Sequence, residues 1–187
     1  MVVTLIGYRA SGKSSVAPRL AKKLGWGWCD CDVLIEQRAG ASINDIFHHE
    51  GEAGFRQRES ELLAELLQRT EIIIASGGGA ILAESNRKLM KEAGPVIWLQ
   101  ASVDVLSRRL GGDRASTNRR PSLTGKPIGE EVAEVLAIRE PLYRECATFT
   151  VDAGAERPEQ MAKRIADYIM STFTDTKFDS APQDESH

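Results

Sequence analysis

Eight consecutive residues, from Gly7 to Ser14, constrain this chain more than any other segment, because they match the pattern G-x-x-x-x-G-K-S. An apolar run from Val2 to Ile6 comes directly before them, as in a buried strand, and a helical spacing of apolar residues then extends to Leu24. Backbone N–H groups of such a turn can surround phosphate oxygens, while Lys13 reaches the β- and γ-phosphates and Ser14 ligates Mg²⁺. The motif therefore predicts nucleotide phosphate binding, and it leaves open which molecule receives the phosphoryl group.

Short apolar segments alternate with helical patterns along the rest of the chain. We expect strands at residues 2–6, 26–31, 71–75, 96–99 and 148–151. We expect helices at residues 14–24, 32–69, 85–93, 102–110, 130–144 and 158–173, the second with breaks at Gly40, Gly51 and Gly54 and a capping box at Ser42. Such alternation predicts an α/β fold in which helices cover both faces of a parallel sheet and ligands bind at the carboxyl ends of the strands.

Composition and charge exclude several classes of protein. A chain of 187 residues is long enough for one domain with a core, and we expect one domain. The net charge of −3 gives no basic field for nucleic acid, and no apolar run approaches the roughly 20 residues of a membrane-spanning helix. The segment before Gly7 also lacks the layout of a signal peptide. We therefore expect a cytoplasmic protein that binds neither nucleic acid nor membranes, and a monomer, because we see no coiled coil or swapped element.

Two aspartates, Asp30 and Asp32, follow one another at the carboxyl end of the expected second strand. Strand alternation would place both carboxylates on one side, near the phosphate-binding loop. One of them could then hold Mg²⁺ or its waters, and the other could align a substrate hydroxyl for attack. The alternative is that Asp32 is the N-cap of the following helix, a role that does not exclude catalysis.

Gly77, Gly78 and Gly79 follow the third expected strand. A flexible turn would explain them, but three glycines in a row at the edge where ligands bind favour a place where the backbone approaches a ligand closely. Two arginines are further candidates: Arg56 lies between expected helices and Arg139 on a helix face. Taken singly, each is more often a solvated charge.

Residues 111–129 form a polar segment rich in glycine and proline, longer than an ordinary connection. Five basic residues lie in this segment or just before it: Arg109, Arg114, Arg119, Arg120 and Lys126. The segment is either a basic surface loop or a lid that closes over ATP. A lid would exclude water from the transferring phosphoryl group and add an arginine to its developing charge.

Taken together, these segments resemble the shikimate kinases, which phosphorylate the 3-hydroxyl of shikimate on the route to aromatic amino acids. The resemblance extends from about residue 2 to residue 173. Besides the phosphate-binding loop it rests on Asp30-x-Asp32 followed by Ile35-Glu36-Gln37-Arg38, Ile46-Phe47 before Phe55-Arg56, Gly77-Gly78-Gly79, Arg120-Pro121-Ser122-Leu123-Thr124-Gly125-Lys126 and Arg139-Glu140-Pro141-Leu142-Tyr143-Arg144. The phosphate-binding loop belongs to many families, whereas the other motifs in this order and spacing are specific.

The resemblance implies a fold and a division of the chain. The fold would be a five-stranded parallel sheet of the nucleoside-monophosphate-kinase type, with helices on both faces. Residues 1–173 would form one kinase domain, with a lid at about 111–129 and a substrate-binding helical region at about 32–60. Residues 174–187 would follow as a polar tail, which we expect to be disordered.

The resemblance also implies a role for each matching residue. Shikimate would be held by Asp32, Arg56, Gly77, Gly78, Gly79 and Arg139, with the two arginines on its carboxylate. ATP would be held by Ala10, Ser11, Gly12, Lys13, Ser14, Ser15, Arg109, Arg120 and Arg157. Lys13, Asp32 and Arg120 would be catalytic, and Ser14 and Asp30 would serve Mg²⁺ as the metal cofactor. Arg9, Arg114 and Arg119 receive no role.

Two other interpretations remain open. A related kinase with gluconate or a nucleoside monophosphate as acceptor would share the phosphate-binding loop and lid. The set of Asp32, Arg56, the triple glycine and Arg139 argues against it. A nucleotide-binding switch of the GTPase type would read guanine through a T-K-x-D motif, and residues 176–179 have this form. They follow no expected strand and lie in the polar tail, so we interpret them as a coincidence.

Overall fold

The computed structural model describes residues 1–112 and 125–173. Within these residues, one sheet contains five parallel strands in the order β2-β3-β1-β4-β5. The strands are β1 (Val2–Ile6), β2 (Gly27–Asp30), β3 (Ile72–Ala75), β4 (Val96–Gln100) and β5 (Phe149–Asp152). The parallel five-stranded sheet that we expected is therefore confirmed. Arg114, Arg119, Arg120 and the expected tail lie outside the described residues.

Strand β1 is the central strand of the sheet, and its side chains are buried on both faces. It pairs with β3 through Val2 and Ile72 and with β4 through Thr4 and Val96. A parallel strand without an exposed face needs helices above and below it. The phosphate-binding loop follows β1 directly, so it leaves the sheet at its middle, between neighbours on either side.

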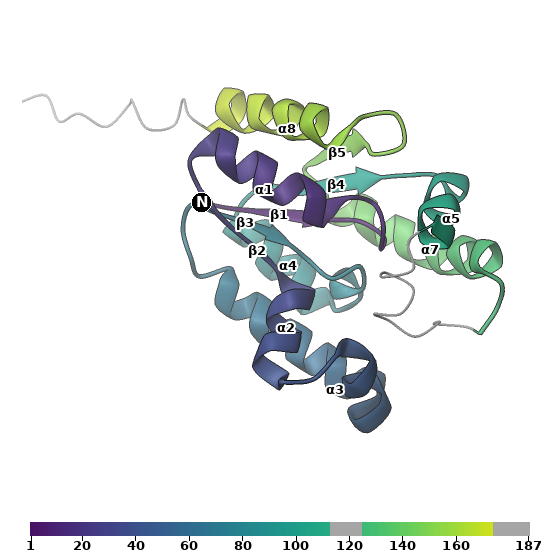
Figure 1. The fold of residues 1–187 in the computed structure, drawn as a ribbon. Helices are drawn as coiled ribbons and strands as arrows, with labels where there is room; N and C mark the ends of the chain where they lie inside the picture. The colour runs from purple at the N-terminus through teal and green to yellow at the C-terminus, as the bar shows by residue number, and fades with distance from the viewer. Residues whose placement is uncertain (113–124, 174–187) are drawn as a thin grey trace, which may run out of the picture.

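Helices cover both faces of this sheet (Figure 1). Helices α1 and α8 pack together over one face, and α4 and α7 contact β1 and β4 from the other. Their bounds, with those of the neighbouring α5 and the short 3-10 helix η1, are α1 (Lys13–Leu24), η1 (Ala80–Leu82), α4 (Glu84–Ala93), α5 (Val103–Gly112), α7 (Ile128–Cys146) and α8 (Pro158–Phe173). In the part of the chain that the structure describes, we find no helix long and apolar enough to cross a membrane.

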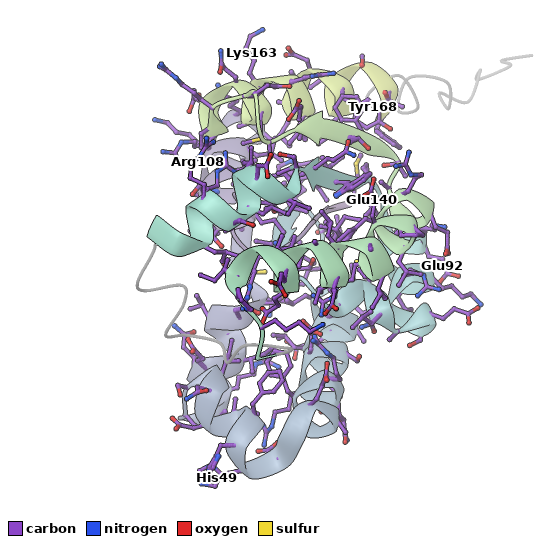
Figure 2. The ribbon with its side chains drawn as sticks, turned by 90° about the vertical axis from the view of Figure 1, so that its right-hand side faces the viewer. His49, Glu92, Arg108, Glu140, Lys163 and Tyr168 are labelled. Carbon is purple, nitrogen blue, oxygen red and sulfur yellow. The ribbon has the colours of Figure 1, made fainter. Side chains whose placement is uncertain are left out.

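Helices α2 (Cys31–Ala39) and α3 (Ile43–Leu66) extend away from the sheet. His49 marks their outer end, and Lys163 and Tyr168 of α8 lie at the opposite end of the molecule (Figure 2). The capping box predicted at Ser42 is present, because its hydroxyl accepts the N–H of Asp45 and the Asp45 carboxylate accepts the N–H of Ser42. This box starts α3 in a fixed direction.

The break that we expected at Gly54 is absent, and α3 continues through it. The kink falls at Gly51, which has φ 70° and ψ −177°. A Cβ on Gly54 would lie 2.6 Å from the Cβ of Glu50, so glycine allows the residues on the two sides of the kink to approach. Arg56, which we expected between helices, therefore lies inside α3 and projects from a regular helix.

The second strand also ends earlier than we expected. Asp30 is its last residue, and its carboxylate accepts the N–H groups of Asp32 at 3.0 Å and Val33 at 3.3 Å. These bonds satisfy free N–H groups at the start of α2, so the helix begins at Cys31. The N-cap is thus Asp30 rather than Asp32. The prediction that strand alternation aligns the two aspartates was wrong, because Asp32 belongs to the first turn of α2.

Candidate active site

The phosphate-binding loop has a conformation that favours small residues. Gly7 and Gly12 have φ values of 142° and 103°, and Ala10 has a φ of 62°. A Cβ on Gly7 would lie 2.7 Å from the carbonyl oxygen of Leu99 in β4. Glycine is therefore required at position 7 both for its backbone conformation and for the closeness of the neighbouring strand.

Lys13 points back into this loop. Its Nζ donates hydrogen bonds to the carbonyl oxygens of Gly7 at 2.8 Å and Tyr8 at 2.9 Å. The residue is 8% exposed, so the ammonium lies within the loop rather than in solvent. Lys13 is also the first residue of α1, where the positive end of the helix dipole adds to its charge. This arrangement suits phosphate oxygens.

Ser14 and Asp30 form an oxygen-rich pair at the edge of the same loop. The Ser14 hydroxyl donates to the Asp30 carboxylate at 2.5 Å. Hydroxyl and carboxylate oxygens are ligands that Mg²⁺ prefers, and Mg²⁺ commonly uses one or two carboxylates together with phosphates. No cluster of three or more His, Cys, Asp or Glu side chains suited to a metal occurs in residues 1–112 and 125–173. These two residues therefore fit an ion held jointly with the nucleotide.

Asp32 faces the first of the three glycines from the opening turn of α2. A Cβ on Gly77 would lie 3.2 Å from Asp32 Oδ1 and would overlap the carboxylate of Glu59. Two carboxylates from α2 and α3 thus lie against the same backbone position. Strand alternation was the wrong reason to expect Asp32 near the phosphate-binding loop. Asp32 nevertheless lies beside the triple glycine, which contacts that loop.

Of the next two glycines, Gly78 lies close to the phosphate-binding loop and Gly79 lies close to Arg56 of α3. A Cβ on Gly78 would lie 3.3 Å from the backbone nitrogen of Arg9 and 3.4 Å from the carbonyl oxygen of Gly7. A Cβ on Gly79 would overlap the guanidinium of Arg56. Each glycine permits a close approach that a side chain would prevent, which favours a functional role over a plain flexible turn.

Arg56 is held by carboxylates of its own helix. Its guanidinium pairs with Glu59 at 2.5 Å and with Glu52 at 3.3 Å. Glu59 is only 1% exposed, and so deeply buried a carboxylate requires a cation beside it. Glu59 was not among the residues predicted from the sequence. Its spacing of three residues from Arg56 on one helix was the available signal, but that spacing alone does not reveal which helix face is buried.

Arg139 and Tyr143 both project from α7 to the second glycine. The carbonyl oxygen of Gly78 accepts a hydrogen bond from the Arg139 guanidinium at 3.2 Å and from the Tyr143 hydroxyl at 2.5 Å. Both residues are buried. Burial raises the pKa of Tyr143 above its ordinary value, so the hydroxyl remains a donor. Arg139 was predicted as a site residue from the sequence, whereas no role was predicted for Tyr143.

The remaining nucleotide candidates lie around the phosphate-binding loop and the segment after β5. Arg109 donates to the carbonyl oxygens of Ala10 at 3.3 Å and Ala153 at 2.6 Å, and so joins these two segments. The N–H of Arg157, just before α8, donates to Gln160 at 2.9 Å. Ser11 and Gly12 belong to the loop, and Ser15 follows in α1 with its N–H donating to Gly12 at 3.0 Å. Arg120 lies outside the described residues.

Comparison with known proteins identifies the family. The sequence model described as "Shikimate kinase" matches residues 9–170. The chain belongs to the shikimate kinase family. The shikimate kinase of Rhodopirellula baltica is 44% identical to it over 161 residues, which are 86% of each chain. The solved structure of shikimate kinase from Acinetobacter baumannii in complex with shikimate is 36% identical, with a TM-score of 0.85, and the match covers 91% of this chain and 93% of that one.

Likeness to other kinases is limited to the fold. A solved gluconokinase from Sinorhizobium meliloti is 16% identical, with a TM-score of 0.50 over 91% of this chain and 95% of that one. At this identity the match shows a shared α/β architecture only. The shikimate kinase family is thus distinguished by much higher identity over the same length of chain.

In this chain of the shikimate kinase family, Asp30 caps α2 and is also a candidate ligand of Mg²⁺. Asp30→Asn tests the two roles separately. The amide oxygen of asparagine can still cap α2, because Asn is among the preferred N-cap residues. It carries no charge for a cation, so we expect the Mg²⁺ concentration for half-maximal kinase activity to rise roughly tenfold, with thermal unfolding unchanged. Activity measured against Mg²⁺ concentration, together with calorimetry, checks both outcomes.

The control for this experiment is Asp30→Ala, which removes the cap as well. We expect it to lower the free energy of unfolding by about 1 kcal/mol in addition to raising the Mg²⁺ requirement. An Asp30→Asn protein with an unchanged Mg²⁺ requirement would show that Asp30 serves only as the helix cap.

Proposed function

We propose that this chain transfers the γ-phosphoryl group of ATP to the 3-hydroxyl of shikimate. The products are shikimate 3-phosphate and ADP, and the reaction belongs to the route to chorismate and aromatic amino acids. The observation that supports this most is the position of Gly78. Its carbonyl oxygen binds Arg139, and a Cβ at this position would lie 3.3 Å from the backbone nitrogen of Arg9 in the phosphate-binding loop. A cation for an acceptor carboxylate thus lies beside the nucleotide site.

The acceptor is held by residues around the triple glycine. Arg56 and Arg139 pair with the carboxylate of shikimate, and Asp32 accepts a hydrogen bond from its hydroxyls. The protein has a net charge of −3, so an anionic substrate requires such local cations. Arginine also offers two parallel donors that match a carboxylate, which orients the substrate as well as binding it. Because Gly77, Gly78 and Gly79 have no side chains, the groups that hold the acceptor can approach one another closely.

Phosphoryl transfer then follows from this placement. The 3-hydroxyl oxygen attacks the γ-phosphorus, the bond from that phosphorus to the bridging oxygen breaks, and the hydroxyl proton moves to Asp32. Lys13 and Arg120 stabilise the charge that develops on the transferring group. When bound by Ser14 and Asp30, Mg²⁺ neutralises charge on the β- and γ-phosphates. Catalysis is mainly positioning and electrostatic stabilisation.

The rest of the nucleotide site and the organisation of the chain complete the proposal. Ala10, Ser11, Gly12, Ser14 and Ser15 contact the phosphates, and Arg109 and Arg157 lie near the adenine. Residues 1–173 act as one kinase domain, with a lid at about 111–129 and a substrate-binding helical region at about 32–60, followed by the tail at 174–187. We place this monomeric enzyme in the cytoplasm.

An ADP-release assay with three acceptors tests the proposal. We expect Mg²⁺-dependent turnover with shikimate and little with gluconate or AMP. Lys13→Ala and Arg139→Ala should each lower kcat/KM by about a hundredfold or more, because each removes a charged partner of a substrate anion. Circular dichroism confirms that the variants fold. Equal turnover of gluconate, or full activity of Arg139→Ala, would contradict the assignment.

Gly79→Ala tests the acceptor side alone. The new methyl group would overlap the Arg56 guanidinium, which is the far end of a flexible side chain and can move. We therefore expect a folded protein with a KM for shikimate raised about tenfold and with ADP affinity unchanged. Steady-state kinetics and ADP titration measure the two quantities.

The matched control is Gly27→Ala in β2. There, among the described residues, the nearest atom that a Cβ would meet outside its own chain neighbours is the carbonyl oxygen of Glu71 at 3.9 Å, so both constants should stay at the wild-type values. Loss of ADP affinity in Gly79→Ala would mean that the third glycine supports the nucleotide site rather than Arg56.

A further inference from the structure

Arg9 of the phosphate-binding loop has no part in the proposed reaction, yet the structure gives it a specific partner. Its guanidinium pairs with the carboxylate of Glu131 in the first turn of α7. The side chains are 18% and 2% exposed, so the pair is largely shielded from water. A buried carboxylate with a missing counterion is strongly unfavourable, so this contact fixes the phosphate-binding loop to α7.

The Tyr8 side chain connects this pair to Arg139. Its ring centroid lies 5.9 Å from the guanidinium carbon of Arg9 and 6.0 Å from that of Arg139. Tyr8 is 2% exposed, and cations near a desolvated aromatic ring are attracted to it. The position of Tyr8 therefore depends on Arg9 on one side and influences Arg139 on the other.

Helix α7 is connected to the phosphate-binding loop directly through Arg9 and indirectly through Gly78 of the triple glycine. Glu131 binds Arg9 at the first turn, and Arg139 binds the carbonyl oxygen of Gly78 farther along the helix. Gly78 in turn lies against the backbone of Arg9 and Tyr8. The phosphate-binding loop, α7 and Gly78 therefore each contact the other two. Loss of the contact between Arg9 and Glu131 would leave Arg139 bound to Gly78, but Tyr8 would no longer align its guanidinium.

We propose that the Arg9–Glu131 pair is a positioning element for the acceptor site: it holds the Tyr8–Arg9 segment against α7 and thereby sets the direction of the Arg139 guanidinium. Neither residue touches a substrate. The proposal rests on the proposed function to the extent that Arg139 binds the acceptor carboxylate. It adds a link from the loop that binds ATP to the arginine that binds the second substrate.

Steady-state kinetics of Arg9→Met, Glu131→Gln and the double variant test this link. We expect each single change to raise the KM for shikimate about fivefold with kcat changed less than about twofold, because alignment of a binding group is lost rather than a reacting group. The double variant should be no worse than the worse single variant, since both changes break the same contact. A purely structural role would not produce this separation of KM from kcat.

Glu134→Gln is the matched control. Glu134 lies three residues after Glu131 on α7, but it is exposed and pairs with Lys126 rather than with the phosphate-binding loop. The same loss of one carboxylate charge should leave the KM for shikimate unchanged. An equal rise of KM in this control would mean that the charge of α7, and not the Arg9 contact, is responsible, which would overturn the proposal.

Replacing the pair by Arg9→Met with Glu131→Leu guards against loss of folding, because apolar groups of similar volume often replace a buried ion pair without loss of stability. We expect this protein to fold and still to show the raised KM, since methionine cannot hold Tyr8 as the charged pair does. A wild-type KM in this protein, or in Glu131→Gln, would overturn the proposal.

The outcomes also separate this proposal from others. If Arg9→Met abolishes turnover while Glu131→Gln does not, Arg9 acts on a substrate directly and the positioning role is wrong. If the wild-type protein phosphorylates gluconate or AMP instead of shikimate, the proposed function fails, and the KM values for that acceptor still decide whether the pair acts through Arg139.

Discussion

Three successive positions without side chains allow the parts of this site to touch. Gly77 makes room for carboxylates of α2 and α3, Gly78 for the phosphate-binding loop, and Gly79 for the Arg56 guanidinium. The sheet order supplies the other condition, because β3 is the direct neighbour of β1. The ends of these two strands therefore lie side by side, and the segments that follow them meet without any long connection.

Two buried carboxylates near the site each pair with an arginine. Glu59 accompanies Arg56, and Glu131 accompanies Arg9, with both carboxylates almost fully buried. Arg139 instead binds a backbone carbonyl oxygen, so its positive charge is not cancelled by a neighbouring carboxylate in that contact. In an acidic protein this leaves Arg139 well suited to an anion, while the pairs around it fix its surroundings.

Local patterns in the sequence predicted the fold and the position of the phosphate-binding loop. The phosphate-binding loop and the capping box at Ser42 depend on residues close in the chain, so their spacing was sufficient. The aspartates were placed wrongly because the side chain of Asp30 starts a helix where a strand was expected to continue. Glu59, Tyr143 and the Arg9–Glu131 contact could not be predicted, since each depends on which helix face meets a distant segment. Asp32, Arg56 and Arg139 were candidates from their places in the chain, whereas the roles predicted for them came from resemblance to a family.

The hydrogen bonds of Lys13 affect how nucleotide affinity should be understood. Its ammonium already donates to two carbonyl oxygens of its own loop. A phosphate oxygen that takes up this ammonium competes with those internal acceptors. The affinity that Lys13 contributes is therefore a difference between two sets of hydrogen bonds, smaller than the strength of a lysine–phosphate contact taken alone.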